Sequence, residues 1–232
     1  MKQLIAEYSK LNGLERRVMQ LIALVNGKVS YTTIEHLSKN SGWKESGKKP
    51  IDAKTSRSTM DHLIKRNLLR GSAYSSCDVA AEITDYAIRD SIKTGWFEKI
   101  CEAIKNAPSD HLYNYGDGLT VRKQRIAFYS GDSDTFLENR KYSAAKYIRF
   151  LDPFDRAIYD QLNPIIRSRY VCDSVSREII APSGAGELLE IFSSMLENLD
   201  PLEKTIHWHS PSQVWRSISR PLLLNRRNLQ RA

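Results

Sequence analysis

Basic side chains gather in one stretch of this chain, between Lys44 and Arg70. Eight of them stand there against three acidic residues, a surplus of five in a chain whose whole net charge is +8. Ammonium and guanidinium groups bind phosphate oxygens and the edges of bases. The chemistry that this stretch favours is therefore the binding of a polyanion, and the pI near 9.3 agrees with such a partner.

Nine residues make up the DNA-binding site that this stretch predicts: Lys44, Lys48, Lys49, Lys54, Thr55, Arg57, Ser58, Lys65 and Arg70. The first three lysines precede a predicted helix and suit backbone phosphates. The residues from Lys54 to Ser58 occupy its first turns, which reach base edges when a helix enters the major groove. Arg57 lies at the edge of the face that this helix buries. The alternatives are a charged helix face that is only solvated, or one that docks onto a protein.

Three other motifs resemble sites but are better explained as structure. Residues 42–49, GWKESGKK, nearly match the phosphate-binding loop GxxxxGK[ST], but lysine replaces the hydroxyl that holds magnesium and no buried strand precedes the motif. His207 and His209 alternate like a metal-binding pair, yet no Cys, Asp or Glu set completes a site nearby. Residues 183–187, SGAGE, fit the start of a helix, where Glu187 would repel an anion.

No residue pattern favours catalysis. Cys77, Cys101 and Cys172 form no CxxC pair and have no histidine in a local motif, and no GxSxG occurs. We therefore expect a protein that is not an enzyme and that uses neither a cofactor nor a metal. The scattered cysteines indicate reduced thiols. Because neither a signal peptide nor a run of roughly 20 apolar residues occurs, we expect a cytoplasmic protein without a membrane span.

The elements that must position the basic residues begin with two amphipathic helices. The helical spacing of apolar side chains predicts one helix from Leu14 to Val25, ended by Asn26-Gly27, and a second over residues 31–40. A short strand is expected between them, at residues 28–30. A polar insert with glycines and a proline, residues 41–50, follows the second helix.

A third helix carries most of the predicted site. It is expected from Asp52, a suitable N-cap, to Arg66. On a helical wheel its buried face holds Ala53, Ser56, Met60, Leu63 and Ile64. Two short strands, residues 68–70 and 79–83, should then surround a Gly/Ser-rich tip, and Thr84 should cap the next helix. A further helix is expected within residues 96–110.

The order of these elements over residues 14–94 resembles the winged-helix superfamily of bacterial DNA-binding domains. The segments HLIKRNLLRGS and VAAEITDYAIRDSI are similar to the way such domains leave the recognition helix, form the wing and begin the final helix. The resemblance implies a domain over residues 1–106, with the helix from Asp52 as the recognition helix and the hairpin as the wing. Since Arg70 is the only basic residue of the segment from Arg70 to Ser76, strong minor-groove contact by the wing is not expected.

The rest of the chain is predicted to be helical. Pro, Asp, Asn and Gly cluster in residues 107–118, which indicates a linker. A second domain, residues 119–232, should contain two antiparallel helices joined at Ser130-Gly131-Asp132, a helix beginning at Asp152-Pro153, and helices over 183–199 and 212–224. Its helix pair is similar to a tetratricopeptide-like solenoid, although no repeat of about 34 residues is present. The expected fold class is mainly α: a winged helix of three to four helices with a small β-wing, followed by an irregular helical domain.

A second basic cluster lies near the end of the chain, where six basic residues stand against one acid from Glu203 to Ala232. This segment is expected to touch DNA, to pack against a partner, or to be a solvated end. We expect a duplex DNA-binding protein, a regulator of transcription or of a mobile element, whose helical part forms a homodimer or contacts a protein partner. The alternative is a protein-interaction module, the N-terminal fragment of a larger multidomain machine.

Overall fold

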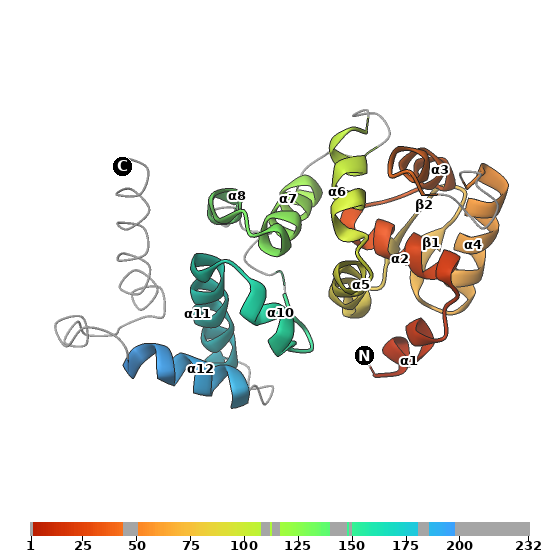
Figure 1. The fold of residues 1–232 in the computed structure, drawn as a ribbon. Helices are drawn as coiled ribbons and strands as arrows, with labels where there is room; N and C mark the ends of the chain where they lie inside the picture. Colours follow the sequence, from red (N-terminus) through yellow and green to blue (C-terminus); the bar gives the residue numbers. More distant parts are fainter. Residues whose placement is uncertain are drawn as a thin grey trace. The chain divides into compact units, whose positions relative to one another are not determined.

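The computed structural model describes residues 2–43, 51–107, 112, 117–139, 148, 150–180 and 186–197. Over these residues the fold is mainly helical with one two-stranded antiparallel sheet, which confirms the predicted fold class (Figure 1). The chain forms two compact units. The first comprises Met1–Ser130 and Asp134–Ile158, and the second comprises Gly131–Ser133 and Tyr159–Ala232.

The first unit contains most of the named elements. In chain order they are α1 (Lys2–Ser9), α2 (Gly13–Val25), α3 (Tyr31–Asn40), α4 (Ala53–Lys65), β1 (Leu69–Ser72), β2 (Ser76–Val79), α5 (Ala81–Lys93), α6 (Phe97–Lys105) and α7 (Asp117–Ser130). Helix α2 forms the centre of this unit and contacts α3, α4, α5, α6, α7 and β2. Every residue of α2 from Val18 to Val25 is buried, so this helix is the core around which the other elements pack.

Both ends of α2 follow from its local sequence. Asn12 is the N-cap and exchanges two hydrogen bonds with Glu15: the Glu15 backbone N–H donates to Asn12 Oδ1 at 2.9 Å, and the Asn12 backbone N–H donates to Glu15 Oε2 at 3.0 Å. This reciprocal pair satisfies two N–H groups that the helix itself cannot. At the other end Asn26 adopts a left-handed conformation with φ of 48°. The predicted stop at Asn26-Gly27 is confirmed.

Helices α3 and α4 lie where the sequence predicts them. Ser30 caps α3, and Asp52 caps α4 by accepting a hydrogen bond from the Thr55 N–H at 2.7 Å. The short strand expected at residues 28–30 reduces to one bridge, in which Val29 and Cys77 exchange backbone hydrogen bonds of 2.9 Å. The bridge places the N-terminus of α3 beside the hairpin.

The second strand of the hairpin is wrongly predicted. We expected residues 79–83, but β2 pairs Leu69 with Val79 at one end and Ser72 with Ser76 at the other. Ala and Glu favour a helix, so α5 begins at Ala81, directly after the strand. Thr84 consequently lies inside the first turns of α5 instead of capping it, and its hydroxyl donates to the Ala80 carbonyl at 3.1 Å.

Helix α7 belongs to the first unit. It contacts α2, and the Tyr129 hydroxyl donates to Asp85 of α5. Asp85 also accepts from the Asp152 N–H at 3.1 Å and pairs with Arg89 at 3.1 Å. The division between the compact units falls after α7. Most of the predicted linker, residues 107–118, lies outside the described residues.

Helix α8 (Ser133–Asn139) begins in the second unit and continues in the first, and α10 (Arg156–Gln161) crosses the division in the other direction. The single helix predicted from Asp152-Pro153 is wrong, because α10 ends at Gln161 and α11 (Pro164–Ile180) is a separate helix. Proline fits the first turn of a helix but not its interior. Asn163 supports this start, since its Oδ1 accepts from the Ile165 N–H at 2.9 Å.

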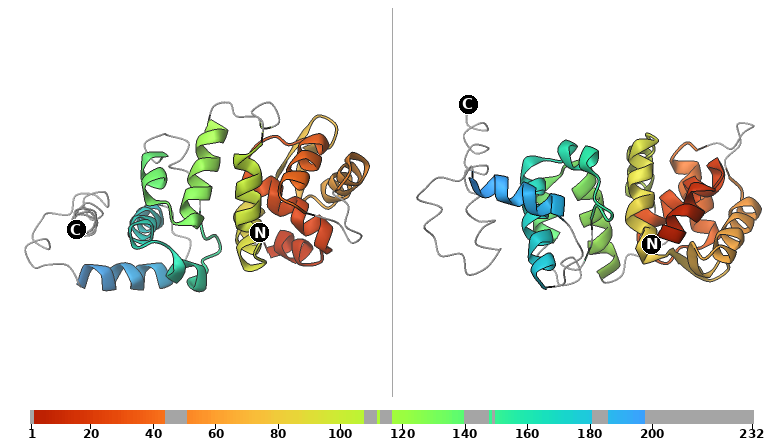
Figure 2. Two further views of the ribbon diagram at one scale, coloured as in Figure 1. Left: turned by 45° about the horizontal axis from the view of Figure 1, so that its top comes forward. Right: turned by 90° about the horizontal axis from the view of Figure 1, so that it is seen from below.

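Helix α12 (Gly186–Glu197) confirms the helix predicted over 183–199 and packs against α11 (Figure 2). The helix predicted over 212–224 lies outside the described residues. Among the described helices, none combines the length and the apolar character that a membrane span requires.

Candidate nucleic-acid interface

Helix α4 presents a polar face to solvent. Ser56, Met60 and Leu63 are fully buried on the opposite face, where α4 packs against α2, α3 and β1. The predicted burial of Ala53 and Ile64 is partial, and Thr59, which the wheel did not include, is buried. Burial of one face fixes which side chains the other face can offer to a partner.

The outer face of α4 carries two lysines at its two ends. Lys54, Ser58 and Lys65 are exposed and fall within a narrow stripe at 100° per residue, with the half-buried Asp61 between them. The rise of an α-helix separates Lys54 from Lys65 by about 16 Å along the axis. Among the described residues, neither lysine side chain forms a hydrogen bond or a close ion pair, although the charge of Lys54 helps to lower the pKa of Asp52. Both charges are therefore available to a phosphate.

The N-terminal turns of α4 combine hydroxyl groups with one carboxylate. Ser58 donates its hydroxyl to the Thr55 carbonyl at 3.0 Å, and its oxygen lone pairs remain as acceptors. The pKa of Asp52 lies below its ordinary value because the Thr55 backbone N–H donates to the carboxylate. Asp52 is thus a fixed negative charge beside Lys54, and it opposes the approach of a phosphate to this end of the helix.

Arg57 stands at the edge of the outer face, as the wheel predicts, and meets the hairpin. Its guanidinium carbon lies 3.7 Å from the centroid of the Tyr74 ring. Tyr74 lies at the hairpin tip and is 60% exposed. The nine-residue prediction did not include it. A large aromatic side chain within a turn of small residues, SAYSS, is the sequence signal that would have identified it.

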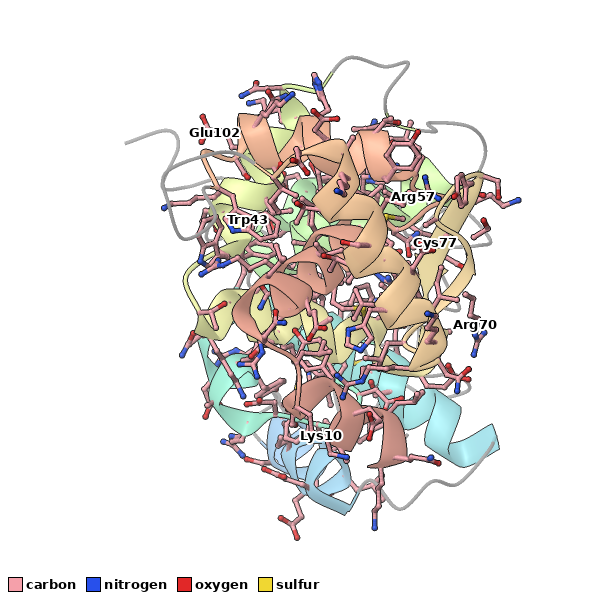
Figure 3. All side chains as sticks on the ribbon, turned by 90° about the vertical axis from the view of Figure 1, so that its right-hand side faces the viewer. Lys10, Trp43, Arg57, Arg70, Cys77 and Glu102 are labelled. Carbon is pink, nitrogen blue, oxygen red and sulfur yellow. The ribbon has the colours of Figure 1, made fainter. Side chains whose placement is uncertain are left out.

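Arg70 lies at the other end of the hairpin from Arg57, and Figure 3 labels both. Its Nη2 donates to both carboxylate oxygens of Glu82, at 2.9 and 2.8 Å. This exposed pair balances the charge of Arg70 locally. The structure therefore assigns Arg70 a partner within the protein, unlike the lysines of α4. Lys44, Lys48 and Lys49 lie outside the described residues.

Several other basic side chains stabilise the fold. Arg66 bonds Glu7 of α1 through Nη2 at 2.8 Å. Arg122 of α7 donates to the Val25 carbonyl at 2.5 Å, and Arg125 donates to Asn26 Oδ1 at 2.7 Å. Cations near the C-terminus of a helix satisfy its free carbonyl groups and its dipole. The C-terminus of α2 thus engages two charges of α7 that the sequence alone would have left available to a partner.

No described group of three or more His, Cys, Asp and Glu side chains is arranged to hold a metal ion. Cys77, Cys101 and Cys172 are free thiols, and burial raises the pKa of each to about 12. A thiol with such a pKa is protonated at neutral pH and is a poor nucleophile. The histidine pair, His207 and His209, lies outside the described residues. Of the SGAGE motif only Gly186 and Glu187 are described, and they begin α12.

Comparison with protein-family models, with curated proteins and with solved structures gave no match. The winged-helix resemblance consequently depends on the order of elements in this chain alone: α2, the Val29 bridge, α3, α4, the hairpin and α5.

Proposed function

We propose that this protein binds duplex DNA through the outer face of α4. The observation that carries the proposal is the exposed stripe of Lys54, Ser58 and Lys65 on a helix whose other face is anchored in the core. An α-helix fits the major groove, where such side chains meet phosphates and base edges. The arrangement of α3, α4 and the hairpin supports the same conclusion, because a winged helix has this order.

In this proposal the residues of α4 divide their roles by position. Lys54 and Ser58 belong to the N-terminal turns and contact base edges together with Thr55. Lys65, in the last turn, contacts a backbone phosphate. Each phosphate that a lysine neutralises releases counterions, so affinity should fall steeply with salt.

The wider role that we propose is regulation of transcription or of a mobile element in the cytoplasm, with no catalytic step. The second unit would supply self-association or a protein contact. Leu189 of α12, which is 45% exposed, supports this division of roles. We propose a homodimer as the binding species, since two copies would place two α4 helices on one duplex.

A charge-reversal variant tests the interface. Lys54→Glu combined with Lys65→Glu should weaken binding to a mixed-sequence duplex at least about tenfold at 50 mM salt and should lower the salt slope by about two. The control is Lys105→Glu with Lys123→Glu, which makes the same charge change at exposed positions of α6 and α7. Fluorescence anisotropy gives both affinities. Equal losses in the two variants would show that only net charge matters.

The second candidate is a protein-interaction module. It is favoured by the mixed charge of the surface, where Asp61 interrupts the lysine stripe and Glu82 balances Arg70. Absence of duplex binding by the wild-type chain at 50 mM salt would support this candidate and contradict DNA binding. Retention at low salt alone would not decide, because a protein of pI 9.3 adheres to many polyanions.

A further inference from the structure

The hairpin tip holds Tyr74 away from the core. Ser72 and Ser76 form the last pair of the sheet, so Ala73, Tyr74 and Ser75 make the turn. Ala73 is 1% exposed and fixes the turn to the body of the unit, whereas Tyr74 is 60% exposed. The Tyr74 N–H donates to Ser72 Oγ at 3.3 Å. The turn therefore presents the ring to solvent on a short, anchored loop.

Arg57 orients this exposed ring. Its guanidinium carbon is 3.7 Å from the ring centroid, a distance at which the plane of the cation stacks on the aromatic face. Among the described residues, Tyr74 makes no other ring or cation contact. One face of the ring is thus covered by a cation, and the other remains available to a flat ligand.

The position of the pair relates it to the proposed DNA interface. Arg57 lies one turn of α4 from Lys54, so a duplex held by Lys54 would place its sugar–phosphate backbone near the hairpin tip. A paired base within a duplex has both faces covered by its neighbours. An unpaired base next to the duplex, by contrast, can offer a face to the Tyr74 ring without a break in the duplex.

We propose that Tyr74, held by Arg57, stacks on an unpaired base that flanks the duplex, and that the protein therefore prefers DNA with a single-stranded extension to blunt duplex DNA. The inference rests on the proposed function, because α4 must hold the duplex. The ring accepts any base, since every base has a π-face, so the preference is for structure and not for sequence.

Three DNA molecules with one duplex sequence test this proposal. The first is blunt, the second carries a five-nucleotide extension, and the third carries the same extension with abasic sites in place of its bases; both strand polarities are made. Wild-type protein should bind the second about five- to fiftyfold more tightly than the first, by fluorescence anisotropy. The third should bind like the blunt duplex apart from a small gain from its phosphates.

Variants assign the preference to the ring. Tyr74→Ala and Tyr74→Leu should each abolish it, because neither side chain offers an aromatic face, while their affinity for the blunt duplex stays within about twofold. Tyr74→Phe should retain the preference. Arg57→Ala should reduce it, and Arg167→Ala is the control, since Arg167 also lies near a tyrosine, 5.8 Å from the Tyr159 ring, in the second unit.

The outcomes separate this inference from the proposed function. Blunt-duplex binding without any preference, or a preference that survives Tyr74→Ala or the abasic extension, overturns the stacking role and leaves duplex binding intact. A preference that depends on Tyr74 supports it. If the wild-type protein binds none of the three DNA molecules, both proposals are overturned.

Discussion

Asp52 has two opposing effects at the proposed interface. Its carboxylate caps α4, and the cap hydrogen bond lowers its pKa further below neutrality, so it is charged at neutral pH, where it repels phosphate. Asn caps a helix as well as Asp does but carries no charge. We expect Asp52→Asn to leave the melting temperature unchanged and to raise duplex affinity about threefold at 50 mM salt, with a smaller effect at 200 mM. Unchanged affinity at both salt concentrations would show that DNA does not approach this end of α4.

Tyr129 donates a hydrogen bond to a carboxylate that lies within the first unit. Asp85 is 6% exposed, and burial raises its pKa although Arg89 and the Tyr129 hydroxyl oppose this effect. Removing the hydroxyl leaves a buried oxygen with one partner fewer. Tyr129→Phe should therefore lower the free energy of unfolding by about 1–3 kcal/mol in urea denaturation.

The matched control for Tyr129→Phe is Tyr86→Phe. Tyr86 is half-buried and packs edge-on against the Tyr8 ring, and its hydroxyl makes no hydrogen bond to a described residue. Removal of the Tyr86 hydroxyl should lower the free energy of unfolding by less than about 0.5 kcal/mol. Equal effects of the two substitutions would mean that the Asp85 contact contributes nothing beyond the ring itself.

At the level of elements, Gly71 determines whether the hairpin can close. Its φ is 108°, and a Cβ atom added there would lie 2.4 Å from the Ser76 carbonyl oxygen. Gly71→Ala should lower the free energy of unfolding by more than about 1 kcal/mol. It should also reduce the preference for single-stranded extensions, because Tyr74 depends on the turn.

Gly13→Ala is the control for the hairpin glycine. Gly13 begins α2, and an added Cβ meets nothing within 4 Å. Alanine there should leave stability unchanged or raise it slightly. A Gly71→Ala variant as stable as the Gly13→Ala variant would show that the hairpin backbone adapts without cost.

The elements themselves were predictable where local chemistry decides them. Asp52 and Asn26 mark helix ends by side-chain or backbone preferences that act within a few residues, and the Asn12 cap, which was not predicted, is equally local. The second strand was not predictable in this way. Val79 to Ile83 are apolar enough for a strand, and only pairing of Leu69 with Val79 ends the sheet where it does.

For the whole molecule, the extent of the first unit is the feature with the clearest test. Its contacts reach from α2 and α5 to Tyr129 and Asp155, and Lys93 of α5 donates to Asp155 at 2.7 Å. A chain of residues 1–158 should unfold in one cooperative transition. A chain of residues 1–106 should be less stable by at least about 2 kcal/mol, because it removes the partners that Asp85 has in Tyr129 and Asp152 and the partner that Arg89 has in Asp155.

Urea denaturation followed by circular dichroism compares these two fragments. Equal stability of the two would place the boundary at residues 107–118, as the cluster of Pro, Asp, Asn and Gly predicts. A less stable shorter fragment would agree with the compact unit that includes α7.

The amino-acid sequence by itself determined the helical character, the C-terminal end of α2, the cap of α4, and the outward position of Lys54, Ser58 and Lys65, because periodicity and capping depend on near neighbours. Only the tertiary structure decided which charges are available. Arg70 meets Glu82, and Arg122 and Arg125 meet the end of α2, nearly 100 residues away in the chain. Spacing shows which face of an element a residue occupies. It does not show what that face meets, and for this reason the Arg57–Tyr74 pair emerged only from the fold.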